Sequence, residues 1–394
     1  MLDRIEIKAF KSIREADISL GEINVFIGAN GSGKSNVLEA IGVLGAAAAG
    51  RVDDEALLRR GVRPGVPALY KSSFRGQRLR DAIRFGAFSG TTSYEVELNN
   101  PIDRPKPTWD FKTEKFMVDG EKVVGRSRAS YNYSKLDAGR GLAALKDVEL
   151  DEDSSGSSLL RSLREYAIYA PNTSTLRGIV SDPQTRSPVG LAGGRLAEAI
   201  DDLRRMSRSD ERLDEVIDDI EELIDWVATF GARGGSSVPL SPTIPRQQRV
   251  LFFRDRYMAD KRNELSAYDA SEGALYVLFS AVLSAHPASP SVLAIDNFDA
   301  ALNPRLVRSL TERMTDWILD HGRQLLLTCH NPLVLDGLRI NDDRVRLFAV
   351  DRTTKGVTVV RRIAVDRKLL ARAKKGWPLS RLWTAGHLGG VPNV

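Results

Sequence analysis

The residues best suited to chemistry form one glycine-rich stretch near the start of the chain. Residues 28–35 read Gly-Ala-Asn-Gly-Ser-Gly-Lys-Ser and match the pattern GxxxxGK[ST] at every fixed position. Glycines let consecutive backbone N–H groups turn toward an anion, and the side chains of Lys34 and Ser35 can reach nucleotide phosphates and Mg²⁺, respectively. The stretch therefore predicts a phosphate-binding loop (P-loop).

The elements that must position this loop are visible on both sides of it. The apolar run 23–27 predicts a buried strand, and apolar residues at helical spacing from Val37 to Leu44 predict a helix that packs on a sheet. The positive end of that helix would face the bound anion. The residues that we expect to contact the nucleotide are Asn30, Gly31, Ser32, Gly33, Lys34, Ser35 and Asn36.

A second set of candidate residues follows two apolar runs in the last third of the chain. The run 291–295 ends in Asp296, which is where a Walker B aspartate meets the Mg²⁺ shell, so Ser35 and Asp296 are the predicted metal ligands. A buried strand that simply ends at a solvent-exposed turn is the alternative for this run. His330 follows the next apolar run, 324–329, at the same expected edge of a parallel sheet, where it could sense a γ-phosphate.

Composition indicates an ordinary globular protein. Hydrophobic residues make up 42% and charged residues 28% of the 394 positions, and no apolar run reaches the ~20 residues of a membrane span. The first residues lack a signal-peptide pattern, so we expect a cytoplasmic protein without membrane contact. A single cysteine, Cys329, excludes an intramolecular disulfide. The net charge of +5 is too balanced to predict nucleic-acid binding by itself. The basic segment 361–381 is best interpreted as a solvated face, and contact with DNA or with an acidic partner surface is the alternative.

The order of the predicted elements suggests three parts. Alternating residues at 94–98 and a predicted hairpin over 109–124 indicate an antiparallel side sheet. Residues 127–160 resemble a loop or linker, and apolar residues spaced by three and four over 196–230 predict one or two amphipathic helices. The expected parts are residues 1–125, the N-terminal half of a nucleotide-binding head; 126–245, an inserted loop and helical lobe; and 246–394, the C-terminal half with a basic tail.

Further motifs, in order, give the chain a resemblance to a known family. Residues 2–13 resemble an opening strand, 270–274 (Ala-Ser-Glu-Gly-Ala) a signature motif, 299–304 a D-loop, and 329–332 a switch-histidine segment. With the P-loop, these motifs make the chain similar to ABC-type ATPases of the SMC/RecF/OLD group, the short AAA family ATPases of bacterial genome maintenance and antiphage defence. The resemblance implies an α/β fold: the mixed sheet and flanking helices of an ABC-type P-loop NTPase head, with an antiparallel β side sheet and a helical insertion.

The resemblance also implies how the chain would use ATP and Mg²⁺. In such proteins two heads dock head to tail, so that Ser271 and Gly273 of one subunit would complete a site built on Lys34 and Asp296 of the other. ATP would then hold a homodimer, or a higher homo-oligomer, together. A phosphate bound by two protomers has more polar partners than one protomer supplies. An alternative for Ser271 is a helix cap, and both roles can hold.

The predicted catalytic residues are Asp296, Asn297, Asp299 and His330, and one of them departs from the family pattern. The residue after the Walker B aspartate is normally a glutamate that orients the attacking water, and here it is Asn297, whose amide cannot accept the water's proton. Asp299 is a candidate substitute. We therefore expect an ATPase with slow turnover.

Four functional classes use a P-loop of this kind, and the sequence favours the first two over an OLD nuclease and a transporter ATPase. The first is an ATP-gated dimeric switch or scaffold for a separately encoded effector, such as a nuclease or toxin, in antiphage defence. The second is a RecF-like ATPase of DNA repair, for which DNA would be a ligand. An OLD nuclease needs a Toprim domain with a carboxylate cluster, and the 64 residues after His330 (394 − 330) contain no DxD. A transporter ATPase is disfavoured because 236 residues (271 − 35) separate Ser35 from Ser271, far more than transporter ATPases insert between these two motifs.

Overall fold

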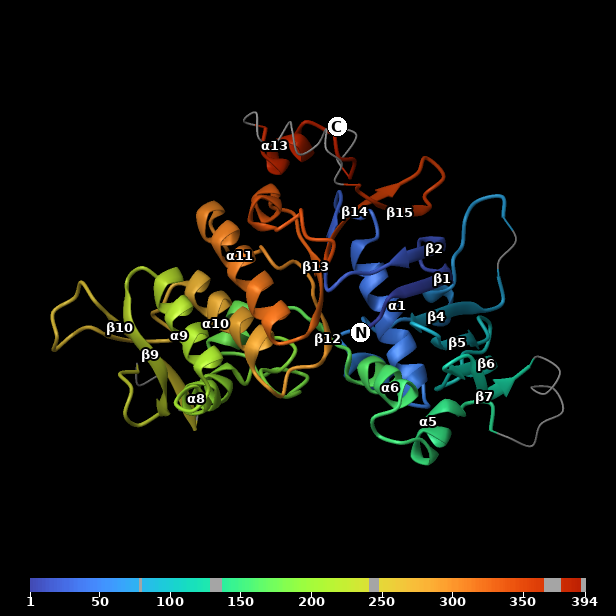
Figure 1. Ribbon diagram of the computed structural model, residues 1–394, viewed down its shortest axis with the longest axis horizontal. Coiled ribbons are helices and arrows are strands. Elements are labelled where there is room, and N and C mark those ends of the chain that lie inside the picture. Colours follow the sequence, from blue (N-terminus) through green and yellow to red (C-terminus); the bar gives the residue numbers. More distant parts are fainter. Residues whose placement is uncertain (78–79, 128–136, 241–247, 365–376, 391–394) are drawn as a thin grey trace.

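The computed structural model describes residues 1–77, 80–127, 137–240, 248–364 and 377–390. A central sheet separates an N-terminal region, on the right of Figure 1, from a helix-rich region on the left. Within the described ranges, no helix combines the length and apolarity of a membrane span.

The central sheet carries the loops expected to do chemistry. Its strand order is β15-β14-β3-β13-β12-β8, and all neighbouring pairs are parallel except β14 with β15. Its strands span β3 Ile23–Ile27, β8 Ile168–Tyr169, β12 Val292–Ile295, β13 Gln324–Thr328, β14 Val345–Arg352 and β15 Thr358–Arg362. The expected mixed sheet with flanking helices is therefore confirmed.

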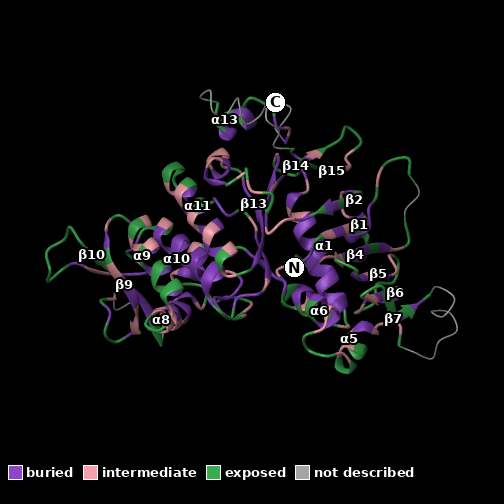
Figure 2. Ribbon diagram, in the orientation of Figure 1, coloured by how far each residue is buried: buried purple, intermediate pink, exposed green. Residues whose placement is uncertain are grey.

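Alternate residues of the central strands enter two different hydrophobic cores. Leu325 and Leu327 of β13 pack toward α10 Glu272–Ala285, whereas Leu326 packs toward α1 Lys34–Ala48. Both faces of these strands are buried, which explains why their sequences are continuous apolar runs rather than alternating ones. α1 and α10 are themselves buried over most of their length (Figure 2).

The N-terminal region is built on an antiparallel sheet with the order β2-β1-β4-β5-β6-β7. Its strands span β1 Arg4–Phe10, β2 Ile13–Ser19, β4 Ile83–Ser89, β5 Thr92–Asn99, β6 Asp110–Val118 and β7 Glu121–Arg126. The predicted hairpin over 109–124 forms as β6 and β7 around Asp119 and Gly120, both of which have positive φ. The side sheet packs on α1 and so fixes one flank of the P-loop helix.

The helix-rich region packs on the opposite face of the central sheet. Helices α8 and α9 pack on α10 and α11 beside a small antiparallel sheet of order β11-β10-β9. These elements span α8 Leu196–Ser207, α9 Glu211–Leu223, β9 Val227–Gly234, β10 Arg249–Asp255, β11 Glu264–Ser266 and α11 Pro304–Asp320. The predicted helical stretch 196–230 is thus two helices followed by a strand.

The chain between these regions contributes to both of them. Helix α6 packs on α1, while β8 joins the central sheet beside β12. The remaining short helices are α2 Asp54–Leu58, α3 Pro67–Tyr70, α5 Ala143–Lys146, η1 Asp147–Glu149, α6 Ser155–Glu165, α7 Thr173–Leu176, η2 Pro332–Gly337 and α13 Leu379–Thr384.

A buried carboxylate ties the β1–β2 turn to the P-loop helix. Glu39 of α1 is 2% exposed and forms ion pairs with Lys11 of the turn and with Arg63. Burial acts to raise the pKa of Glu39, but the hydrogen bonds and charges of Arg63 and Lys11 outweigh it and hold the pKa below its ordinary value of 4.5. The charged form is therefore the one that the fold stabilises.

We predict that Glu39→Ala lowers the free energy of unfolding by about 2–3 kcal/mol at pH 7, because it leaves a partly buried Lys11 without its partner. The folded-state pKa of Glu39 is lowered, so its contribution is present above pH 4.5 and is lost as the pH falls through the folded-state value. Urea unfolding at pH 7 and below pH 4.5 measures both effects. The control is Glu15→Ala, which removes a surface ion pair with Lys8 and should change stability much less. Equal losses in the two variants would contradict this role of Glu39.

Candidate nucleotide-binding site

The P-loop lies between the end of β3 and the start of α1, as the sequence predicts. A Cβ atom on Gly28 would lie 2.3 Å from the carbonyl oxygen of Val350 on the neighbouring strand, so only glycine fits there. Gly33 has φ 108° and is the N-cap of α1, where a side chain would also collide with Thr358. Asn30 and Gly31 are exposed at the tip of the loop.

The ammonium group of Lys34 is buried under the loop that it would serve. Its Nζ donates to the carbonyl oxygens of Gly28, at 2.7 Å, and Ala29, at 3.2 Å. Lys34 is 5% exposed, and burial lowers its pKa from the ordinary value. The carbonyl dipoles of the loop stabilise the positive charge of Lys34 at the place where a bound phosphate would provide a full negative counter-charge.

Ser35 and Asp296 come together although 261 residues separate them in the sequence. The Ser35 hydroxyl donates to both carboxylate oxygens of Asp296, at 3.0 and 2.9 Å, and the Thr328 hydroxyl donates to Oδ1 of the same carboxylate. A hydroxyl and a carboxylate side by side at a P-loop are the oxygen ligands that Mg²⁺ uses together with phosphates. These residues therefore fit the expected metal.

Asn297 follows Asp296 in a left-handed backbone conformation. Its φ is 56°, its side chain is exposed, and its backbone N–H donates to the Thr328 hydroxyl at 2.9 Å. Asparagine tolerates this conformation better than most residues with a Cβ atom. The local backbone therefore suits the amide found here.

Asp299 is engaged in the turn that carries His330. Asp299 is 8% exposed, and its Oδ2 accepts hydrogen bonds from the backbone N–H groups of His330, at 2.8 Å, and Asn331. His330 is exposed at the end of β13, but its ring is partly buried, and this partial burial together with the charge of Lys34 lowers its pKa, so its imidazole is neutral at pH 7. These two hydrogen bonds hold the turn that carries His330, while the other carboxylate oxygen of Asp299, Oδ1, has no hydrogen-bond partner among the described residues.

Ser271 and Gly273 lie away from the P-loop, at the start of α10. The Ser271 hydroxyl caps α10 by accepting from the backbone N–H of Ala274 at 3.4 Å, and Gly273 packs against Leu306 of α11. Together they border a hollow of about 490 Å³ that also includes Asn303. Ser271 therefore caps α10, which is the alternative role predicted for it. The start of α10 is also exposed, so a partner could contact it.

Hydroxyl and amide groups outside the P-loop support it, and of these side chains the sequence pattern indicated only Asn36. The Thr358 hydroxyl of β15 donates to the carbonyl of Ser32 at 2.6 Å and shares a 2.7 Å hydrogen bond with the Ser12 hydroxyl. Asn36 donates to Ser12 at 2.7 Å, so the Asn36 side chain braces α1 against the β1–β2 turn. Thr358 and Thr328 carry no local sequence signal, since isolated threonines in strands are common.

Most of the predicted site residues lie close together in the part of the chain that the structure describes. Lys34, Ser35 and Asp296 share one edge of the central sheet with Asn297 and His330, whereas Ser271 and Gly273 belong to the helix-rich region. Within the basic segment 361–381, residues 365–376 lie outside the described ranges, and Arg361, Arg362 and Arg381 are exposed.

Comparisons with known proteins agree with this architecture. The family described as "AAA domain, putative AbiEii toxin, Type IV TA system" matches residues 23–336. The DNA replication and repair protein RecF of Renibacterium salmoninarum is 35% identical over 100 residues, 25% of this chain and 22% of that protein. RecF of Magnetococcus marinus is 44% identical over 102 residues, 23% of this chain and 27% of that protein. The match thus spans about a quarter of each RecF chain.

Among solved structures, an SMC head bound to the C-terminal winged-helix domain of ScpA superposes with a TM-score of 0.52 at 13% identity, covering 94% of this chain and 99% of that one. This similarity supports the SMC-head type of α/β fold, while the family match covers well over half of the chain. The chain therefore belongs to the family described as "AAA domain, putative AbiEii toxin, Type IV TA system", within the ABC-type ATPases of the SMC/RecF group.

Proposed function

We propose that this protein is an ATP-gated dimeric switch that recruits a separately encoded effector. The observation that carries the proposal is the division of the site between two regions of the chain. Lys34 and Asp296 lie at the P-loop edge, whereas Ser271 is presented by α10, which packs on the other face of the central sheet from α1 (Figure 1). Among the described residues, no hydrogen bond links Ser271 to the P-loop. A second protomer would supply what one protomer lacks.

The residues of the P-loop edge would each have a defined task with ATP and Mg²⁺. The backbone N–H groups of residues 30–35 and the Lys34 ammonium would bind the phosphates, while Ser35 and Asp296 would hold Mg²⁺. The metal would contribute neutralisation of charge on the β- and γ-oxygens. His330 would contact the terminal phosphate from the end of β13.

The same residues favour binding over rapid turnover. Asn297 occupies the position where related ATPases carry the glutamate that orients water, and an amide is not a base. Asp299 is engaged by the backbone of His330 and Asn331. A nucleotide that persists in the site would prolong the dimer, which suits a switch.

Two observations bear on the setting and on a protein partner. The family description refers to a toxin of a type IV toxin–antitoxin system, which favours a toxin–antitoxin or defence setting. The SMC head with a similar fold is bound to a domain of another protein, ScpA, so a head of this kind can serve as a docking platform.

A RecF-like role in DNA repair is the second candidate, favoured by the two RecF matches. Those matches cover about a quarter of each RecF protein, so they do not extend to the whole protein's activity. The genes beside this one separate the candidates, because a nuclease or toxin gene favours the switch and replication or recombination genes favour repair.

We predict that Lys34→Ala weakens ATP binding about 10- to 100-fold, because it removes the buried charge that faces the phosphates. Titration with a fluorescent ATP analogue measures the affinity, and circular dichroism checks the fold. Lys8→Ala removes a partly exposed lysine from β1, away from the P-loop, and should leave the affinity unchanged. An unaltered affinity in Lys34→Ala would remove the basis of the proposed function.

We predict that ATP with Mg²⁺ promotes self-association and that Ser271→Arg prevents it, because the new side chain adds bulk and charge to the exposed start of α10. Light scattering after size-exclusion chromatography gives the mass with and without nucleotide. Ser209→Arg, in the exposed turn between α8 and α9, is the matched control. Identical masses with and without ATP in the wild type would contradict the gating model.

We predict slow phosphate release by the wild type and a faster rate in Asn297→Glu. A positioned base contributes on the order of 10²–10⁴ in rate, and the left-handed backbone at Asn297 costs glutamate about 1 kcal/mol, so the gain should fall toward the lower end of that range. Phosphate-release assays on the wild type, Asn297→Glu and Asp299→Asn measure it. A brisk wild-type rate that Asp299→Asn abolishes would instead identify Asp299 as the base. Brisk turnover that survives Asp299→Asn would contradict both assignments.

A further inference from the structure

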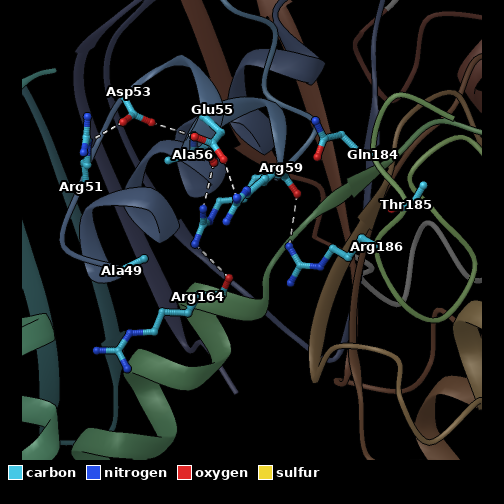
Figure 3. Close-up of a pocket in the computed structure, with 11 residues that line it drawn as sticks. Ala49, Arg51, Asp53, Glu55, Ala56, Arg59, Arg164, Gln184, Thr185 and Arg186 are labelled. Carbon is cyan, nitrogen blue, oxygen red and sulfur yellow. Dashed lines mark hydrogen bonds and ion pairs between the residues drawn. The ribbon is translucent and has the colours of Figure 1, made fainter. Parts of the chain in front are cut away.

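An arginine-rich hollow of about 630 Å³ lies at the opposite end of α1 from the P-loop. The 15 residues of α1 separate the two places by roughly 20 Å. One wall comes from the end of α1, from α2 and from the end of α6, and the other comes from residues 184–186 (Figure 3). Five arginines line it: Arg51, Arg59, Arg60, Arg164 and Arg186.

Three of these arginines have carboxylate partners. Arg51 forms an ion pair with Asp53 at 2.5 Å, and Arg59 forms one with Glu55. Arg164 pairs with Asp147. The remaining two arginines are the ones that give the hollow its excess positive charge.

Arg60 and Arg186 contact carbonyl oxygens instead of carboxylates among the described residues. Arg60 donates to the carbonyls of Ala56, at 2.9 Å, and Arg164, at 3.1 Å. Arg186 donates to the carbonyls of Arg59, at 3.3 Å, and Glu165 (Figure 3 draws the first of these). Carbonyl groups use up N–H donors but bring no formal negative charge.

The burial of Arg60 makes this excess charge costly. Arg60 is 6% exposed, and its Nε has no hydrogen-bond partner within the part of the chain that the structure describes. Burial, together with the neighbouring charges of Arg186, Arg59 and Arg164, lowers the pKa of Arg60 to about 10. A buried guanidinium surrounded by three others is unfavourable unless an anion joins them.

The lining indicates the chemistry of that anion. Guanidinium groups bind phosphoryl oxygens in a bidentate manner, and the lining contains no aromatic side chain on which a base could stack. Asp53 and Glu55 also border the hollow and would repel a long polyanion lying across it. A compact ligand with several negative charges is thus favoured over a nucleic-acid strand.

We propose that this hollow is a second anion site, separate from the P-loop, that binds a compact ligand with two or more linked phosphoryl groups. Such a ligand would touch α2 and α6 on one side and Arg186 on the other. Residues 184–186 belong to the loop that leads to α8. Asp182 holds this loop, because its carboxylate accepts hydrogen bonds from the backbone N–H groups of Ala192 and Gly194 just before α8. Ligand binding would therefore connect the P-loop helix with the helix-rich region.

Isothermal titration calorimetry with inorganic tripolyphosphate tests the proposal. The Lys34→Ala protein is the background, because it weakens binding at the P-loop. We expect saturable binding to a single site that Arg59→Gln with Arg186→Gln weakens at least about tenfold, and that Arg59→Gln alone weakens less. Arg161→Gln with Arg205→Gln, two exposed arginines outside the hollow, should leave the affinity unchanged. Thermal midpoints of all variants show whether the fold is kept.

Three results would overturn the proposal. The first is no saturable binding of tripolyphosphate in the Lys34→Ala background. The second is equal weakening by the hollow and control substitutions, which would indicate unspecific attraction to the basic surface. The third is duplex DNA that binds more tightly than tripolyphosphate and depends on the same arginines, since the hollow would then belong to a nucleic-acid surface. None of these results bears on whether ATP binds the P-loop of the wild-type protein.

Discussion

The structure depends on burying both faces of the central parallel strands. Because β3, β12 and β13 run parallel, their carboxyl ends meet at one edge of the sheet, and the residues that follow them lie close together. Alternate side chains of these strands enter the α1 core or the α10 core, so a shift of register by one residue would exchange the two. The positions of Lys34, Asp296 and His330 follow from this packing.

Polar contacts over long sequence distances then fix the loops at that edge. The Ser12 and Thr358 hydroxyls, 346 residues apart, meet beside the P-loop, and Thr328 joins the Ser35–Asp296 contact from the next strand. Buried polar groups need partners, so each of these contacts restrains the loop as well as satisfying a donor. The loop is preorganised before any phosphate arrives.

The charges of the molecule are arranged for holding anions more than for transferring protons. Lys34 rests on backbone carbonyls, Asp299 is bound by backbone N–H groups, and the exposed residue next to Asp296 is the amide Asn297. At the other end of α1, buried Arg60 faces three further guanidiniums. Both ends of this helix thus lie beside positive groups that need a counter-charge, which supports the proposal of a ligand-controlled switch.

The sequence by itself determined the P-loop, the strands that precede Asp296 and His330, and the α/β class, because these depend on local patterns of glycine and apolar residues within short windows. It also predicted the 109–124 hairpin and the amphipathic stretch that became α8 and α9. Only the tertiary structure decided that Asp299 holds the His330 turn, that Thr358 supports the loop, and that Arg60 and Arg186 meet in one hollow. Those contacts join residues far apart in the chain, and no local spacing encodes a distance that exists only after the sheets and helices have packed.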